Sequence, residues 1–258
     1  ICAKYMEDCF EALGVPREKV RFVLASEIMD ITYWEKVMKV GKVTSLSRIK
    51  RAMTIMGRKE DDAELDSSKF LYPLMQATDI FQMNIDLAYS GIDQRRAHML
   101  AREAGEKLQW KVPVALHTPL LPGLKGLSRM DPIANKMSKS DPDSGIIIHD
   151  SPADIERKIK KAFCPPEAEG NPILAIAKMI LFQKSSVFAI ERPEKFGGRL
   201  EFTSYEELES TYVAGKLHPM DLKTGVAKAL SEQLQAARDY FERNPKNLEA
   251  MRRSLGLM

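Results

Sequence analysis

Apolar residues recur along the chain with two different spacings, which indicate where helices and strands lie. The helical spacing predicts four helices in the first half of the chain, over residues 1–13, 32–56, 72–89 and 93–104. Gly41 is expected to interrupt the second of them. Short apolar runs predict strands over residues 20–25, 110–116 and 146–149. Strands that alternate with helices favour an α/β fold with a parallel sheet.

The pattern changes near residue 150, where strand signals almost disappear. Ser151 followed by Pro152 is typical of a helix start, and Ser204 with Glu207 has capping-box spacing. One long amphipathic stripe follows, made of Leu222, Val226, Leu230, Leu234, Ala237 and Phe241. We therefore expect an α/β domain over residues 1–150 and an all-α domain over residues 151–258.

Composition excludes several classes of protein. Hydrophobic residues make up 44% of the 258 positions, which is enough to bury a core and excludes general disorder. No apolar run approaches 18 residues, so no membrane span is expected. The three cysteines and four histidines are too dispersed for a disulfide scaffold or a metal site, so we expect no protein-bound metal. The chain starts at Ile1 without a signal peptide, which predicts a cytoplasmic protein from which an upstream segment has been removed.

The net charge of +3 is small, but the charges are unevenly distributed. Eight basic residues and no acidic residue occur between Lys36 and Lys59, and an acidic run follows at once. Such a stretch is either a solvated helix face or a surface that contacts a phosphate backbone. The charge pattern does not choose between these two interpretations.

The strongest local motif is the pentapeptide Lys136-Met137-Ser138-Lys139-Ser140, in a loop rich in Pro, Gly, Ser and Asp. Two lysines three residues apart, flanked by hydroxyl groups, can clamp a polyphosphate. Such a clamp lowers a reaction barrier when negative charge develops on a departing polyphosphate.

Three polar residues share one face of the predicted helix that begins at residue 72. Tyr72, Gln76 and Asp79 are spaced four and three apart, which places them on the same side of a helix. An apolar helix face accommodates such residues when they share a polar ligand.

The pentapeptide is the KMSKS signature of class I aminoacyl-tRNA synthetases, and the chain resembles the tyrosyl-tRNA synthetase family of archaeal and eukaryotic type. The resemblance covers essentially the whole chain and is carried by matching segments at residues 72–79, 91–95, 136–140, 160–164, 192–198 and 218–223. It implies a Rossmann-like catalytic domain, with an inserted region for the dimer interface and acceptor stem, followed by a helical anticodon-binding domain. The implied activity is that of a tyrosine–tRNA ligase that uses ATP with Mg²⁺ as its substrate.

The resemblance also assigns roles to individual residues. It places Tyr72 and Gln76 at the ammonium group of the tyrosine substrate, Asp79 at its phenolic hydroxyl and Gln94 at the tyrosine end of the site. Gly91 and Asp93 would face the ribose of ATP and of tyrosyl-adenylate. The family usually has two glycines here, where this chain has Ser90-Gly91. Lys136 and Lys139 would be the catalytic residues, within an ATP-binding set of Lys136, Met137, Ser138, Lys139 and Ser140.

For tRNA, the resemblance implies two contact regions. Arg51 and Arg95 match family positions at the first base pair of the acceptor stem. The pocket for the first anticodon base is matched by Phe196, His218, Pro219, Met220 and Asp221. An aromatic ring can stack on a splayed base, and a carboxylate can accept hydrogen bonds from the N–H edge of guanine. Family members are homodimers, and residues 32–56 are the candidate interface.

One motif of the family does not occur in the sequence from Ile1 onward. Class I synthetases carry an H-I-G-H-like motif on their first βα turn, which the family places upstream of Ile1. Two alternatives to a tyrosine–tRNA ligase stay open. One is a tryptophanyl-tRNA synthetase, which shares the fold and KMSKS, and the other is a non-catalytic tRNA-binding fragment, which the missing motif favours. Asp79 argues against the first alternative, and an intact phosphate clamp and amino acid pocket argue against the second.

Overall fold

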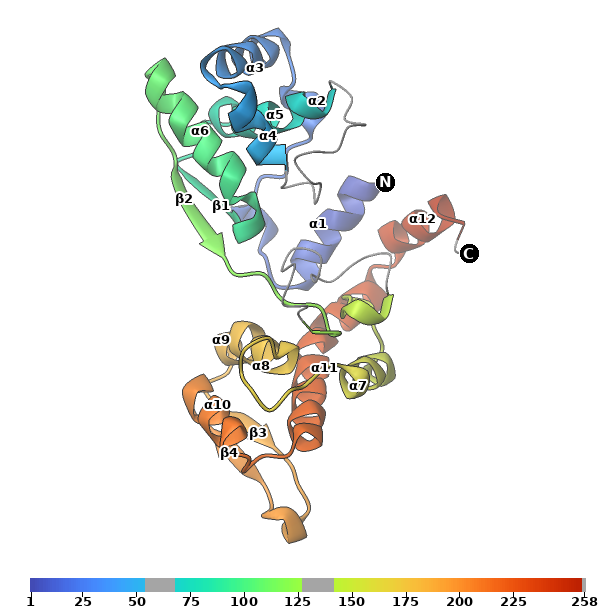
Figure 1. Ribbon diagram of the computed structural model, residues 1–258. Helices are drawn as coiled ribbons and strands as arrows, with labels where there is room; N and C mark the ends of the chain where they lie inside the picture. The colour runs from blue at the N-terminus through green and yellow to red at the C-terminus, as the bar shows by residue number, and fades with distance from the viewer. Residues whose placement is uncertain (54–67, 127–141, 257–258) are drawn as a thin grey trace. The chain divides into compact units, whose positions relative to one another are not determined.

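The computed structural model describes residues 1–53, 68–126 and 142–256. They form two compact units (Figure 1), which are described separately. Unit 1 comprises Ile1–Phe22 and Leu121–Met258, and unit 2 comprises Val23–Leu120. These units are defined by packing, and the functional boundary near residue 150 stays a prediction.

Unit 2 combines helices with a two-stranded sheet. Its elements in chain order are α2 (Ala25–Ile28), α3 (Ile31–Val43), α4 (Leu46–Met53), α5 (Ser68–Gln82), β1 (Leu87–Gly91), η3 (Ile92–Gln94), α6 (Arg95–Leu108) and β2 (Val114–Thr118). Helices α3, α4 and α6 all pack on α5. Their shared core is formed by Tyr33, Val37, Val40, Ile49, Ala52, Met53, Leu74, Ala77, Ile80, Ala88, Leu100, Ala101 and Ala104.

Strands β1 and β2 pair in parallel, with a register that runs from Leu87 opposite Val114 to Gly91 opposite Thr118. The parallel pairing brings the carboxyl ends of both strands to one edge, and η3 and α6 follow β1 directly. In open α/β sheets, ligands bind beyond the carboxyl ends of the strands. The sheet topology therefore directs attention to the residues that follow Gly91.

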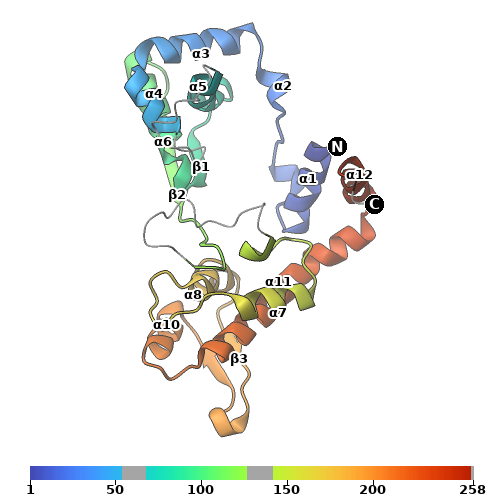
Figure 2. The same cartoon turned by 45° about the vertical axis from the view of Figure 1, so that its right-hand side comes forward.

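Unit 1 is mainly helical. Its helices of five residues or more are α1 (Cys2–Ala12), α7 (Pro152–Lys161), α8 (Pro172–Ile176), the π-helix η5 (Ala177–Leu181), α10 (Tyr205–Val213), α11 (Pro219–Arg243) and α12 (Lys246–Ser254). Shorter elements complete it: η1 (Arg17–Lys19), η4 (Pro142–Ser144), α9 (Phe182–Lys184), β3 (Phe188–Ile190), η6 (Glu194–Phe196) and β4 (Leu200–Phe202). Helix α11 is the centre of the unit, and α7 and α1 both pack along it (Figure 2).

The expected signals for helix starts in unit 1 are confirmed. Ser151 caps α7 by accepting a hydrogen bond from the Asp154 amide at 3.1 Å, and Ser204 caps α10 by accepting from the Glu207 amide at 3.2 Å. The predicted stripe on α11 is buried at Leu222, Val226, Leu230, Ala237 and Phe241, with Leu234 partly buried. Apolar burial along this stripe holds α11 in the core of the unit.

The region after residue 150 is not entirely helical, in contrast to the all-α expectation. Strands β3 and β4 form an antiparallel pair of three residues each. Phe188 and Ile190 are buried on alternate positions of β3, and Phe202 is buried on β4. Segments this short carry too little alternation to be distinguished from loops in sequence.

Two predicted strands are wrong. Residues 20–24 pair with no strand within the described part of the chain, and α2 begins at Ala25. Residues 146–149 lead into a turn that Asp150 closes, because its carboxylate accepts a hydrogen bond from the Ile147 amide at 3.0 Å. Both errors have one cause: an apolar run becomes a strand only where a partner supplies hydrogen bonds.

Two helix boundaries also differ from expectation. The helix predicted to continue to residue 89 ends at Gln82, since Asn84 adopts a left-handed backbone (φ 52°) that a helix cannot continue through. By contrast, α3 continues through Gly41 to Val43. A Cβ at Gly41 would lie 3.2 Å from Leu74 Cδ1, so this glycine allows α3 to pack closely on α5.

Candidate active site and tRNA-contact surfaces

The polar face predicted on the helix beginning near residue 72 lies on α5 of unit 2. Tyr72, Gln76 and Asp79 occupy successive turns of α5, which continues through Pro73. Tyr72 is 45% exposed, whereas Gln76 and Asp79 are half-buried. A ligand that contacts all three residues would therefore extend from the surface towards the core along this helix.

Gln76 contacts another predicted site residue, Gln94, at the junction of η3 and α6. Gln76 Nε2 donates a hydrogen bond to Gln94 Oε1 at 3.1 Å. Gln76 Oε1 is buried and has no hydrogen-bond partner within the described ranges. A buried acceptor without a donor is costly, so this atom is suited to receive a donor from a ligand.

Asp79 has a protein partner that the sequence did not indicate. The Tyr33 hydroxyl donates a hydrogen bond to Asp79 Oδ1 at 2.8 Å. Burial raises the pKa of Asp79, and the hydrogen bond from Tyr33 acts in the opposite direction by stabilising the carboxylate. Tyr33 is 46 residues away in sequence, and its place in the helical pattern is that of an ordinary core residue, so no local signal could have identified it.

Gly91 and Asp93 lie at the carboxyl end of the parallel sheet, the edge at which open α/β sheets bind ligands. A Cβ at Gly91 would lie 2.7 Å from Asp93 Oδ1 and 3.1 Å from Leu120 Cδ2. A side chain there would displace the carboxylate, so the glycine gives Asp93 the space it occupies. Gly91, Asp93 and Gln94 are consecutive or nearly so, and all belong to the same unit as α5.

The predicted phosphate clamp, Lys136, Met137, Ser138, Lys139 and Ser140, lies outside the described residues. Its position relative to Gly91 and Asp93 stays a prediction from the sequence.

The two arginines predicted to contact the acceptor stem both lie in unit 2, Arg51 on α4 and Arg95 at the start of α6. Arg51 lines a cavity of about 450 Å³ together with Lys42, Arg48, Glu103 and Lys107. Arg48 forms an ion pair with Glu103 at 2.7 Å, which neutralises part of this basic surface. One residue of the basic stretch between Lys36 and Lys59 therefore helps to hold α4 on α6.

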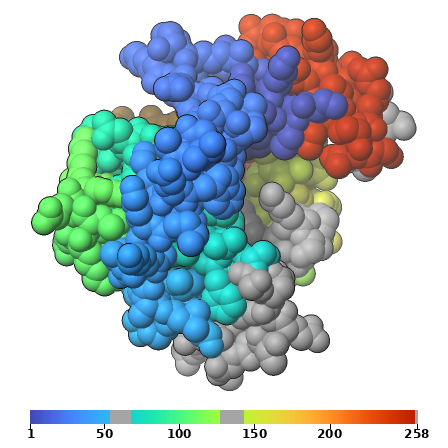
Figure 3. All heavy atoms as spheres, turned by 90° about the horizontal axis from the view of Figure 1, so that it is seen from above, coloured from blue at the N-terminus to red at the C-terminus, as the bar shows by residue number. Residues whose placement is uncertain are grey.

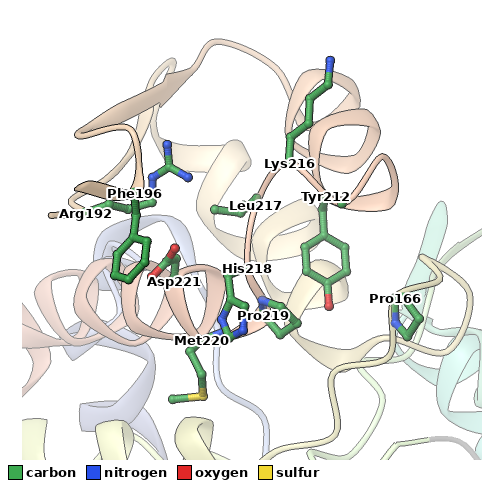
Figure 4. A pocket seen from close by; sticks show the side chains of 11 residues that line it. Pro166, Arg192, Phe196, Tyr212, Lys216, Leu217, His218, Pro219, Met220 and Asp221 are labelled. Carbon is green, nitrogen blue, oxygen red and sulfur yellow. The ribbon is translucent and has the colours of Figure 1, made fainter. Parts of the chain in front are cut away.

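The residues predicted to bind the anticodon base line one cavity of unit 1. Phe196, His218, Pro219, Met220 and Asp221 surround a space of about 610 Å³ (Figure 4). Phe196 is 60% exposed, and the ammonium group of Lys195 lies 4.9 Å from the centre of its ring. The figure shows the Phe196 ring and the Asp221 carboxylate projecting towards this cavity, from η6 and the first turn of α11.

Local geometry explains how this cavity is built. His218 Nδ1 accepts a hydrogen bond from the Met220 amide at 3.2 Å, which caps α11. Arg192 Nε donates to the Gly198 carbonyl at 3.0 Å and closes the loop that carries Phe196. Arg192, Tyr212 and Pro166 also line the cavity and were not among the predicted site residues. The sequence could have identified Arg192, because it lies in residues 192–198, one of the segments that match the family.

Comparison with known proteins defines the class of protein first. The chain belongs to the family described as tRNA synthetases class I (W and Y), whose model matches residues 4–235. This family includes both tryptophan and tyrosine enzymes, so membership alone does not choose between them.

Within this family, the chain is similar to individual tyrosine enzymes. The chain is 48% identical to the tyrosine–tRNA ligase of Aeropyrum pernix, over 98% of this chain and 72% of that protein. It is 47% identical to that of Saccharolobus solfataricus, over 95% and 70% respectively. It also matches the crystal structure of a tyrosyl-tRNA synthetase complexed with L-tyrosine from Pyrococcus horikoshii, with a TM-score of 0.89, 41% identity, and coverage of 97% of this chain and 73% of that one.

Proposed function

We propose that this chain activates L-tyrosine with ATP and transfers it to tRNA(Tyr). The fold and the family define a class I synthetase, and relatives at 47–48% identity are tyrosine–tRNA ligases, which supports tyrosine over the tryptophan alternative. The structural observation that carries the proposal is the polar face of α5. There, Gln76 Oε1 is a buried acceptor without a donor, and the Asp79 carboxylate lies one turn further along the helix.

These groups fit the two polar ends of tyrosine. The substrate ammonium would donate to Gln76 Oε1 near Tyr72, and the phenolic hydroxyl would donate to Asp79. Gln94, which is already hydrogen-bonded to Gln76, would hold that amide in place. The ATP ribose would lie against Gly91 and Asp93, beyond the carboxyl end of β1.

The proposed reaction needs no side-chain nucleophile. An oxygen of the tyrosine carboxylate attacks the α-phosphorus of ATP, and the bond to the departing pyrophosphate breaks. Lys136, Lys139 and the Mg²⁺ that accompanies ATP would offset the charge on that pyrophosphate. A terminal ribose hydroxyl of tRNA then attacks the adenylate carbonyl, and AMP leaves. We place this reaction in the cytoplasm. Separately, none of the helices within the described ranges could span a membrane.

ATP–pyrophosphate exchange on the full natural polypeptide tests this proposal. Exchange that depends on tyrosine supports it, whereas exchange that depends on tryptophan would show that the specificity is wrong. No exchange with either amino acid would support a tRNA-binding protein without synthetase activity.

We propose that residues 151–258 bind the anticodon and that the Phe196 cavity receives its first base. Replacing Phe196 by alanine is expected to lower kcat/KM for tRNA about 5- to 150-fold, since base stacking on an aromatic ring contributes roughly 1–3 kcal/mol. Tyrosine-dependent pyrophosphate exchange should stay unchanged, because that step does not involve tRNA. Aminoacylation and exchange assays measure the two effects. Phe10→Ala, which removes another exposed ring (45%), is the matched control, and an equal loss in both variants would contradict the assignment.

We propose that the protein is a homodimer that associates through α3. Ile31, Trp34 and Met38 are 79%, 43% and 71% exposed and form an apolar stripe at helical spacing. In Figure 3, the spheres of this part of unit 2 lie at the surface. A second copy of the same stripe would cover it in a symmetric contact.

Met38→Glu is expected to raise the dimer dissociation constant at least about tenfold, because it places a charge at the centre of an apolar contact. Sedimentation velocity over a range of protein concentrations measures this shift. Met6→Glu, at an exposed position on α1, should leave the dissociation constant unchanged. A wild-type protein that sediments as a monomer at all concentrations would refute the dimer.

A further inference from the structure

One buried tyrosine lies next to the proposed amino acid site but was not among the predicted site residues. Tyr33 lies in the first turn of α3, and none of its surface is exposed. Its hydroxyl donates to Asp79 Oδ1 at 2.8 Å and also lies 3.2 Å from the Met75 carbonyl oxygen. Both acceptors are on α5, so this hydroxyl joins α3 to the helix that carries the proposed tyrosine site.

The position of Tyr33 is well defined by its surroundings. Asp30 caps α3, because its Oδ1 accepts hydrogen bonds from the Tyr33 amide at 2.8 Å and from the Thr32 hydroxyl at 2.7 Å. The Tyr33 ring packs edge-on to Trp34, with ring centres 5.7 Å apart. The helix cap and the packing together hold the hydroxyl at a fixed point beside α5.

The contact uses one of the two carboxylate oxygens of Asp79. Within the described part of the chain, Oδ1 accepts from Tyr33, and no other donor forms a hydrogen bond with the carboxylate. A hydrogen bond to one oxygen restricts the rotation of the carboxylate, and the second oxygen remains available to accept another hydrogen bond.

We propose that Tyr33 is a positioning residue for amino acid selection. Its hydroxyl holds the Asp79 carboxylate so that the other oxygen accepts a hydrogen bond from the phenolic hydroxyl of tyrosine. This inference rests on the proposed function, because it assumes that tyrosine is the ligand of Asp79. Tyr33 acts through Asp79 and does not itself need to contact the substrate.

The electrostatics of the pair agree with this role. Burial raises the pKa of Asp79, and the Tyr33 bond opposes that rise by stabilising the ionised carboxylate, which can only accept. Burial and the neighbouring Asp79 raise the pKa of Tyr33, so its hydroxyl stays protonated and remains a donor. Among the described residues, Tyr33 on α3 is the one titratable group that shifts the pKa of Asp79, and no charged side chain of α5 or α6 contributes.

The test is Tyr33→Phe, which removes the hydroxyl and keeps the ring that fills the core. Tyrosine-dependent pyrophosphate exchange is expected to show a KM for tyrosine about 5- to 10-fold higher, with the KM for ATP unchanged. The preference for tyrosine over phenylalanine should fall by a similar factor. The pH profile of kcat/KM for tyrosine falls at low pH, and this acid limb should move to higher pH. The reason is that the pKa of Asp79 rises when its donor is lost.

A purely structural role for Tyr33 predicts different results. It would lower the melting temperature and the active fraction, but it would leave the tyrosine–phenylalanine ratio and the acid limb unchanged. Tyr240→Phe is the matched control, since that hydroxyl also bonds a carboxylate, Glu11 Oε2 at 3.0 Å, in unit 1. The control should keep the wild-type KM, ratio and pH profile.

A double-mutant cycle with Asp79→Ala gives a second test. In that background, Tyr33→Phe is expected to change the KM for tyrosine less than twofold, because no carboxylate remains to be positioned. An equal effect in both backgrounds would overturn the positioning role, as would a Tyr33→Phe enzyme with wild-type KM, ratio and acid limb. Absence of tyrosine-dependent exchange in the wild-type enzyme would instead overturn the proposed function.

Discussion

Replacing Asp79 by alanine is expected to lower kcat/KM for tyrosine in pyrophosphate exchange about 10- to 150-fold, with little change for phenylalanine. A hydrogen bond to a charged group contributes about 1.5–3 kcal/mol, and each 1.4 kcal/mol corresponds to a factor of ten. Only tyrosine has the phenolic hydroxyl that donates to this carboxylate. The two amino acids should therefore become similar as substrates, which exchange assays with each of them measure.

Asp86→Ala is the control for this experiment. Asp86 lies between α5 and β1 in the same unit, its side chain is 84% exposed, and it pairs with Lys111. This variant should retain wild-type kinetics for both amino acids. Unchanged tyrosine kinetics in Asp79→Ala would remove this carboxylate from the substrate site.

The same carboxylate should reduce the stability of the free protein at neutral pH. Its pKa in the folded protein is raised, mainly by burial, so the folded state binds the proton more tightly than the unfolded state. The stability that comes from protonation is present below the unfolded pKa and is lost as the pH rises through the folded pKa. The uncharged variant Asp79→Asn should therefore melt higher than wild type near pH 7.5, and this difference should shrink towards pH 4.

The second large effect is expected in the KMSKS loop. Replacing Lys136 and Lys139 together by alanine should lower kcat for pyrophosphate exchange at least about 100-fold, since the loss of a single transition-state donor typically costs 10²–10³. The KM for tyrosine should change much less, because the proposed role of the lysines is to offset charge on the departing pyrophosphate. Steady-state exchange kinetics separate the two parameters.

A second pair of lysines distinguishes this effect from a general loss of positive charge. Lys184 and Lys228 are exposed residues of unit 1, and the double variant Lys184→Ala/Lys228→Ala removes the same charge. It should exchange at the wild-type rate. If the Lys136/Lys139 variant raised only the KM for ATP and kept kcat, the lysines would bind the ground state and would not assist the reaction.

Local rules of sequence predicted much of this protein. The spacing of Tyr72, Gln76 and Asp79 placed them on one helix face, because helical periodicity depends only on neighbouring turns. The caps at Ser151 and Ser204 were predicted for the same reason. The sequence motifs also identified the family, which the comparisons confirm.

These local rules could not predict contacts between residues that are far apart in the sequence. Residues 20–25 and 110–116 were both predicted as strands, but among the described residues only the second run contributes to a paired strand, β2. Gly41 looked like a helix breaker and is instead the point where α3 approaches Leu74. Strand pairing and close packing depend on which surfaces meet in space, and a sequence window does not contain that information.

The sequence by itself determined the family, and it predicted the helix face that carries the proposed amino acid site. Only the tertiary structure decided which partners these side chains have. It joins Asp79 to Tyr33 and Gln76 to Gln94, and it gathers Phe196 and Asp221 around one cavity. The physical reason is that a hydrogen bond or a pocket requires groups a few ångströms apart, and folding brings together residues that the chain separates by 18 to 46 positions.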